Sequence, residues 1–190
     1  MGARAAFEPI EEEAMHTLTL AALMIALVAV PGTTIAQDAP DTPYFVVEVQ
    51  LVEQNLVGLV PEGLRLDGHT RGAITEGLLA GATTTGIDYL LIRQDGVGVI
   101  DVRGFAQHPD GATAAFAMRG YLGEPAPGVV EAMLDPEYVP PDADIPLHGA
   151  SWWETMAPQY AFLNHTVFGF TGTINLATGM LRMTFRSLAP

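Results

Sequence analysis

Two Asp-Gly turns constrain this chain more than any other feature of its sequence. The first turn, 94–96, separates two runs rich in β-branched residues, 87–93 and 97–105. The second turn, 108–111, contains a proline and a glycine and leads into a third run, 112–122. Glycine takes the positive φ angle that a tight hairpin turn needs, and proline presets φ at the first turn position. Two hairpins in succession predict a three-stranded antiparallel meander.

Strand signals continue on both sides of this meander. The predicted further strands are 44–52, 63–69, 73–79, 166–174 and 180–188. The total is about eight strands separated by turn signals, which is typical of a closed barrel or a sandwich. We therefore expect an all-β domain at 44–190, a single antiparallel β-barrel.

Residues 124–149 break this pattern, because they are acidic and rich in proline. We expect a long loop here, with at most one or two helical turns at 129–134. The stretch 153–163 is expected to be partly helical. The prediction is thus a barrel with a long Pro-rich loop and at most short helices.

The N-terminus has the pattern of an export signal. Residues 18–30 form an uncharged apolar run, shorter than the roughly 20 residues of a membrane-spanning helix. Small residues at 34 and 36 mark a cleavage site after Ala36, so we expect a signal sequence within 1–36 and a periplasmic or secreted protein. An uncleaved anchor is the alternative. The polar residues 37–43 are expected to be a disordered lead-in.

The first 14 residues do not fit a basic signal, since they hold four glutamates and one arginine. Translation from Met15 would resolve this difficulty. Met1 and Met15 therefore both stay open as the start of the chain.

The charge balance excludes several kinds of partner. The chain has 22 acidic and 8 basic residues, for a net charge of −14. Such a surface repels phosphate, so we expect no nucleic acid and, after signal cleavage, no membrane as a partner. The chain has no cysteine, and its histidines lack the spacing of a zinc pair. No Gly-rich phosphate loop opens a helix, so we expect neither a metal nor a cofactor.

The order of several short motifs is familiar. They are Asp88-Tyr89, Asp95-Gly96, Ile100-Asp101-Val102-Arg103, Asp110-Gly111 followed by Gly120, Trp153-Glu154-Thr155, and Tyr160-Ala161-Phe162-Leu163-Asn164. In order and spacing, residues 44–188 resemble the domain of unknown function 3237 family. The resemblance implies a small antiparallel barrel similar to lipocalins and to the allene oxide cyclase barrel, but no established reaction. The chain departs from the family pattern at Gly104 and at 146–149.

Three acidic residues and one arginine are candidates for chemistry. Asp101 and Arg103 are two apart on one predicted strand and share a face. They either bind a ligand inside the barrel or form a structural ion pair. Glu154, next to Trp153, is either a desolvated general base or a solvent-exposed residue. Asp88 either caps a loop or faces the cavity mouth.

The remaining candidates are aromatic residues and one amide. Tyr160 and Asn164 are four apart on a stretch expected to be helical, so they would share a face. Asn164 either orients a carbonyl group of the ligand or caps the following strand. The predicted cavity walls are Tyr89, Phe105, Phe116, Trp152, Trp153 and Phe162.

The first functional hypothesis is an exported barrel that binds a small, mostly apolar organic molecule in its interior. The second is a cofactor-free isomerase, cyclase or lyase, with Glu154 or Asp88 as base and Arg103 as the stabilising cation. The third is a structural or protein-interaction module that uses the loop 124–149. Assembly into a homo-oligomer stays open.

Overall fold

The computed structural model of this chain describes residues 44–124 and 126–188. The predicted signal sequence, its cleavage site and the lead-in at 37–43 lie outside the described residues.

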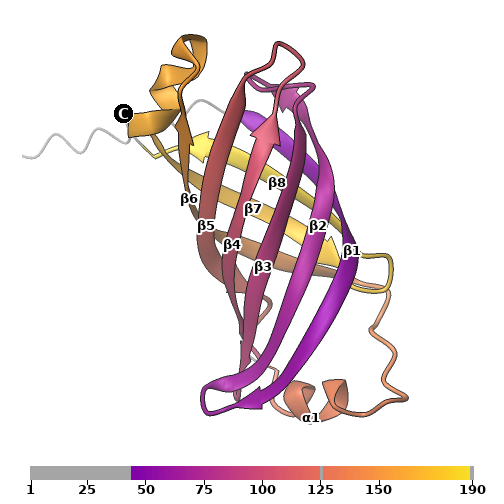
Figure 1. Cartoon of the computed structure of the whole chain (residues 1–190). Helices are drawn as coiled ribbons and strands as arrows, with labels where there is room; N and C mark the ends of the chain where they lie inside the picture. The colour runs from indigo at the N-terminus through magenta and orange to yellow at the C-terminus, as the bar shows by residue number, and fades with distance from the viewer. Residues whose placement is uncertain (1–43, 125, 189–190) are drawn as a thin grey trace, which may run out of the picture. The chain divides into compact units, whose positions relative to one another are not determined.

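Eight antiparallel strands close into a barrel (Figure 1). Each strand pairs with the next one in the sequence, and β8 pairs with β1. The strands are β1 (Phe45–Val60), β2 (Gly63–Gly77), β3 (Thr83–Arg93), β4 (Gly98–Gln107), β5 (Thr113–Leu122), β6 (Asp144–Thr155), β7 (Val167–Asn175) and β8 (Met180–Ser187). The predicted fold class is confirmed.

The two Asp-Gly turns connect β3, β4 and β5 into the predicted meander. Gly96 and Gly111 have φ angles of 86° and 93°, which residues with a side chain rarely adopt. The Gly96 N–H donates to the carbonyl of Arg93 at 2.9 Å, and the Gly111 N–H donates to that of His108 at 3.0 Å. These bonds close each turn and fix the register of the strands that it joins.

The strand boundaries differ from the prediction in the first hairpin. The predicted short strands 63–69 and 73–79 are one strand, β2, because residues 70–72 pair with 49–51 of β1 without a break. β1 also continues to Val60, beyond its predicted end at residue 52.

The predicted loop 124–149 was too long at its C-terminal end. β6 begins at Asp144 and ends at Thr155. Residues 153–155, the start of the stretch that was expected to be partly helical, therefore belong to this strand. Two residues that usually interrupt strands, Pro146 and Gly149, lie inside β6. Gly149 faces Gly120 of β5, and a Cβ on either glycine would overlap a carbonyl oxygen of the other strand. The glycines are there because the two backbones approach so closely.

Two short helices complete the described part of the chain. They are α1 (Val129–Met133) and the 3-10 helix η1 (Pro158–His165). α1 lies within the predicted helical turns at 129–134, and η1 overlaps the predicted stretch 153–163 but begins later and ends two residues beyond it. Within residues 44–124 and 126–188, no helix is both long and apolar enough to cross a membrane.

An aromatic cluster fills part of the barrel interior. The Phe45 ring lies 4.6 Å from that of Phe185 and 5.2 Å from those of Trp153 and Phe168, measured between centroids. All four side chains are buried. The cluster joins β1, β6, β7 and β8, and the rest of the interior is not filled in this way.

Candidate functional site

A cavity of about 90 Å³ lies inside the barrel, beside the aromatic cluster. One ordered water needs roughly 10–15 Å³ of such space, so the cavity has room for a small organic molecule. Its walls are almost entirely apolar. They include Val47, Val49, Leu66, Leu90, Ile100, Val102, Phe116, Met118, Leu122, Leu147, Trp153, Phe170, Ile174, Leu181, Met183 and Phe185.

The cavity reaches the surface near the seam between β1 and β8. These strands pair only as far as Gln50 and Met180, whereas β1 continues to Val60. Gln54 lies in this extension; it is exposed and also lines the cavity. Leu51 and Leu176 line the cavity close to it. The exposed edge of the cavity wall therefore lies at the β1 extension, beside the turn that connects β7 to β8.

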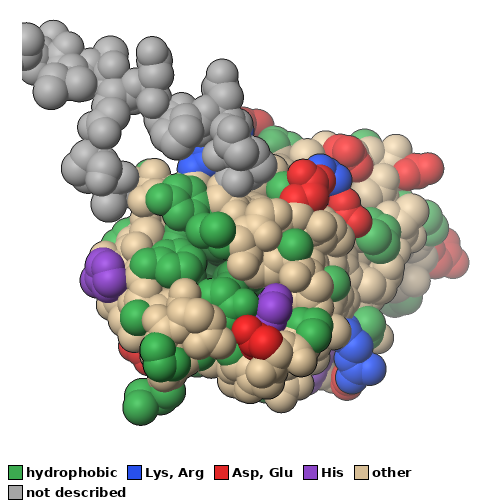
Figure 2. All heavy atoms as spheres, turned by 90° about the horizontal axis from the view of Figure 1, so that it is seen from above, with side chains coloured by type: hydrophobic (Ala, Val, Ile, Leu, Met, Phe, Trp, Pro, Cys, Tyr) green, Lys and Arg blue, Asp and Glu red, His purple; other side chains and the backbone are tan. Residues whose placement is uncertain are grey.

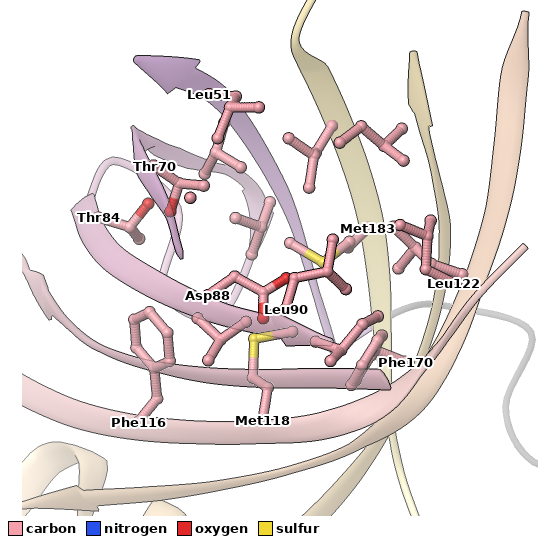
Figure 3. A pocket seen from close by; sticks show the side chains of 18 of the residues that line it. Leu51, Thr70, Thr84, Asp88, Leu90, Phe116, Met118, Leu122, Phe170 and Met183 are labelled. Atoms are coloured by element: carbon pink, nitrogen blue, oxygen red, sulfur yellow. The ribbon is translucent and has the colours of Figure 1, made fainter. Parts of the chain in front are cut away.

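Asp88 of β3 brings a carboxyl group into this apolar interior. Its side chain projects among Leu90, Met118 and Met183 (Figure 3). The strand directs it inward because Asp88, Leu90 and Ile92 alternate with the outward residues of β3. Part of its surface stays exposed, towards the space of the cavity.

The Asp88 carboxylate substitutes for part of the backbone ladder between β3 and β4. Residue 88 pairs with 102, and residue 91 pairs with 99, but the two positions between them are not ladder partners. Here the Asp101 N–H donates to Asp88 Oδ1 at 3.1 Å. No other hydrogen bond to this carboxyl group is present among the described residues, so Oδ2 has no partner there.

Burial raises the pKa of Asp88 from 3.8 to about 7. An apolar environment disfavours the charged form of a carboxyl group. The hydrogen bond from Asp101 and the charge of Arg65 oppose this rise, whereas the carboxylates of Asp101 and Asp67 add to it. A carboxyl group of this kind exchanges its proton close to neutral pH.

Two threonines add uncharged polar groups to the wall. Thr84 is 3% exposed, and its hydroxyl has no hydrogen-bond partner in the described part of the chain. The Thr70 hydroxyl donates to the carbonyl of Gly86 at 3.4 Å. Both threonines line the cavity with Asp88 (Figure 3). Together with Gln54 and Asp88 they supply the polar side chains of the wall.

Arg103 and Asp101 lie on the outer face of β4. Arg103 Nε is 3.2 Å from Asp101 Oδ1, and Arg119 of β5 is 3.6 Å from Asp101 Oδ2. The Arg103 side chain is 56% exposed and does not line the cavity. The two residues do share a face, but this face points outward. Their geometry is that of a surface ion pair, an arrangement that adds little to stability.

The sequence model of the DUF3237 family, which is described as a protein of unknown function, matches residues 42–180 of this chain. The chain belongs to the DUF3237 family.

Solved structures agree with this assignment at the level of the fold. A conserved protein of unknown function from Rhodopseudomonas palustris is 17% identical, with a TM-score of 0.61, over 77% of this chain and 95% of that one. A protein of unknown function from Clostridium acetobutylicum is 20% identical, with a TM-score of 0.61, over 77% and 96%. A β-barrel-like protein from Acinetobacter baumannii is 20% identical, with a TM-score of 0.57, over 76% and 92%. No curated protein matches the chain.

The aromatic residues of the DUF3237 barrel are divided between its two faces. Trp153 and Phe116 line the cavity. Trp152 is 45% exposed, Phe105 is 45% exposed, and Tyr89 points outward beneath Arg65. Phe162 packs against the core without lining the cavity.

Glu154 lies on the outer face of β6, next to the exposed Trp152. Trp153 and Glu154 point to opposite faces because side chains alternate along a strand. The indole of Trp153 instead donates to Ser151 Oγ at 3.1 Å. Glu154 is exposed and does not line the cavity.

Asn164 and Tyr160 connect η1 to the end of the barrel. The Asn164 side chain accepts from the Thr155 N–H at 2.7 Å and donates to the Thr155 carbonyl at 3.0 Å. Tyr160 Oη donates to Asp110 Oδ2 at 3.0 Å and lies 3.2 Å from His108 Nδ1. Hydrophobic side chains gather at this end, beside a histidine and an acidic side chain (Figure 2). Neither Asn164 nor Tyr160 lines the large cavity.

Sequence reasoning missed the polar residues Gln54, Thr70 and Thr84. A signal for Thr84 was present, because it lies four residues before Asp88 on the same strand and therefore on the same face. No group of three or more His, Asp or Glu residues in the described part of the chain is arranged to hold a metal.

Proposed function

We propose that this DUF3237 barrel binds a small, mostly apolar organic molecule in its interior. The observation that carries the proposal is the cavity itself, because a barrel of eight strands has an interior that its own side chains can fill. Here the aromatic cluster fills only a part. A preformed apolar hollow with a few polar groups is the common form of a ligand site.

The walls supply the affinity and Asp88 supplies the orientation. Each Å² of apolar surface that is removed from water on binding contributes roughly 25 cal/mol of favourable free energy. Because the walls carry few polar groups, binding of an apolar ligand would desolvate little polar surface of the protein. The free oxygen of Asp88 offers a directional contact for a hydroxyl or amine hydrogen.

A test of this proposal fills the cavity from one wall. Val102 of β4 points inward and lines the cavity, whereas Val99 lies on the outer face of the same strand. We expect Val102→Phe to weaken the binding of 1-octanol by about tenfold or more, because the added ring occupies the ligand's space. Val99→Phe, the matched control, should change binding by less than about twofold.

The readout is the emission of Trp153 in a Trp152→Phe background, which removes the exposed tryptophan and keeps the one that lines the cavity. Saturable binding that is equally strong in Val102→Phe and in Val99→Phe would place the ligand outside the barrel and refute the proposal.

The second candidate function is acid–base catalysis without a cofactor, and the pKa of Asp88 favours it. A general base is most effective when its pKa lies near the working pH, and that of Asp88 is about 7. Asp88 would take a proton from one atom of the substrate and return it to another, so that the carboxylate is regenerated and an isomer is released. Arg103 takes no part in this mechanism, because its side chain lies on the outer surface of the barrel.

We also propose that the protein is exported and cleaved after Ala36. The apolar run at 18–30 and the small residues at 34 and 36 support this. Intact-mass measurement of the protein from its native cells should give a chain that begins at Gln37. A mass that includes residues 15–36 would instead indicate an uncleaved anchor.

A further inference from the structure

The cavity wall carries one ionisable group, and it is acidic. Among the described residues that line the cavity, Asp88 alone has an ionisable side chain. The chain has no lysine, and the nearest arginines lie on the outside of the barrel. Arg65 pairs there with Asp67 at 2.9 Å, and Arg103 pairs with Asp101. A ligand inside the barrel therefore meets a carboxyl group and no compensating cation.

The groups around Asp88 do not reverse this polarity. Asp101 and Asp67 add negative charge from β4 and β2, and Arg65 of β2 opposes them. From β5, the inward neighbours are Phe116 and Met118, which carry no charge. Thr84 adds a buried hydroxyl without a partner, and this group can bond a polar atom but cannot neutralise an anion.

We propose that the cavity selects by charge: its ligand is an amphiphile whose polar group is uncharged or cationic, such as an alcohol or an amine, and carboxylates are excluded. This inference rests on the proposed ligand-binding function. The free oxygen of Asp88 accepts a hydrogen bond from a hydroxyl group or pairs with an ammonium group. A carboxylate at the same place would lie against a second carboxylate, and two such groups share a site only if one of them is protonated.

The test compares three probes with the same alkyl chain: octylamine, 1-octanol and octanoate. Binding is measured at about pH 8.5 by Trp153 emission in the Trp152→Phe protein. We expect octylamine to bind most tightly, 1-octanol to follow, and octanoate to bind at least about tenfold more weakly than octylamine. At about pH 5.5, where Asp88 is neutral, the ratio of the octylamine affinity to the octanoate affinity should be smaller than at pH 8.5.

Two variants separate the local charge from the overall charge of the protein. Asp88→Asn keeps a carbonyl oxygen for the Asp101 N–H, and it should bring the octylamine and octanoate affinities to within about threefold of each other. Glu154→Gln removes one negative charge from the outer face of β6, and it should leave the tenfold ratio in place.

Equal binding of octylamine and octanoate to the unchanged cavity, or a ratio that survives Asp88→Asn, would overturn the inference and leave the ligand-binding function intact. Failure of all three probes to bind would overturn both proposals.

Discussion

Replacing Asp88 by asparagine should make the protein more stable above pH 7. The folded protein raises the pKa of this carboxyl group from 3.8 to about 7, so the folded state binds a proton that the unfolded state has released. For a raised pKa, the stabilising contribution is complete below the unfolded value and is lost as the pH rises through the folded value. At pH 8, Asp88 therefore costs up to about 4 kcal/mol relative to its neutral form.

Asparagine is neutral at every pH and still presents an oxygen to the Asp101 N–H. Its amide hydrogens are poorly matched to the apolar wall, so we expect a net gain of about 2 kcal/mol at pH 8 and none below about pH 4. The measurement is urea unfolding of both proteins between about pH 4 and pH 9. Glu154→Gln, at an exposed position, should follow the unchanged protein throughout. A difference between the Asp88→Asn and unchanged proteins that does not vary with pH would show that Asp88 keeps an ordinary pKa.

Truncation of Phe45 should have the largest destabilising effect. Its side chain is fully buried, and its ring contacts three other aromatic rings of the cluster. Removing a buried phenylalanine ring costs the transfer free energy of the lost atoms and that of the cavity left behind, typically about 3–5 kcal/mol. We expect Phe45→Ala to lower the free energy of unfolding by about that amount, measured by urea titration at pH 7.

Phe105→Ala is the matched control, since it makes the same change on the outer face of β4, where the ring is 45% exposed. Its cost should stay below about 1 kcal/mol. If Phe45→Ala and Phe105→Ala lower the free energy of unfolding equally, the aromatic cluster around Phe45 does not make the expected contribution to stability.

The fold was predictable where turns and strand periodicity agree. The Asp-Gly turns fixed the meander of β3, β4 and β5 because their backbone requirements are local. β6 was missed because the reason for its glycine lies in another strand. Gly149 is needed where β5 approaches, but in the sequence alone a glycine at this place indicates a loop. The predicted number of strands was nevertheless right, since one strand had been divided in two and another omitted.

The site was predictable only up to the choice of face. Alternation correctly placed Asp101 and Arg103 on one face of their strand, but it does not say whether that face points inward. The tertiary structure decides this, because the face of β4 that carries Ile100 and Val102 is the one that packs inside the barrel with Asp88. Asp88 was a candidate for the cavity mouth, but the sequence did not decide between that position and a loop cap.

The close approach of β5 and β6 has a consequence for how such barrels diverge. At Gly120 and Gly149 the neighbouring backbone leaves no room for a Cβ, whatever the barrel contains. The side chains that border the cavity have room to change size on the side that faces it. Substitutions at these positions can therefore change the shape and polarity of the interior, while Gly120 and Gly149 maintain the close approach of β5 and β6.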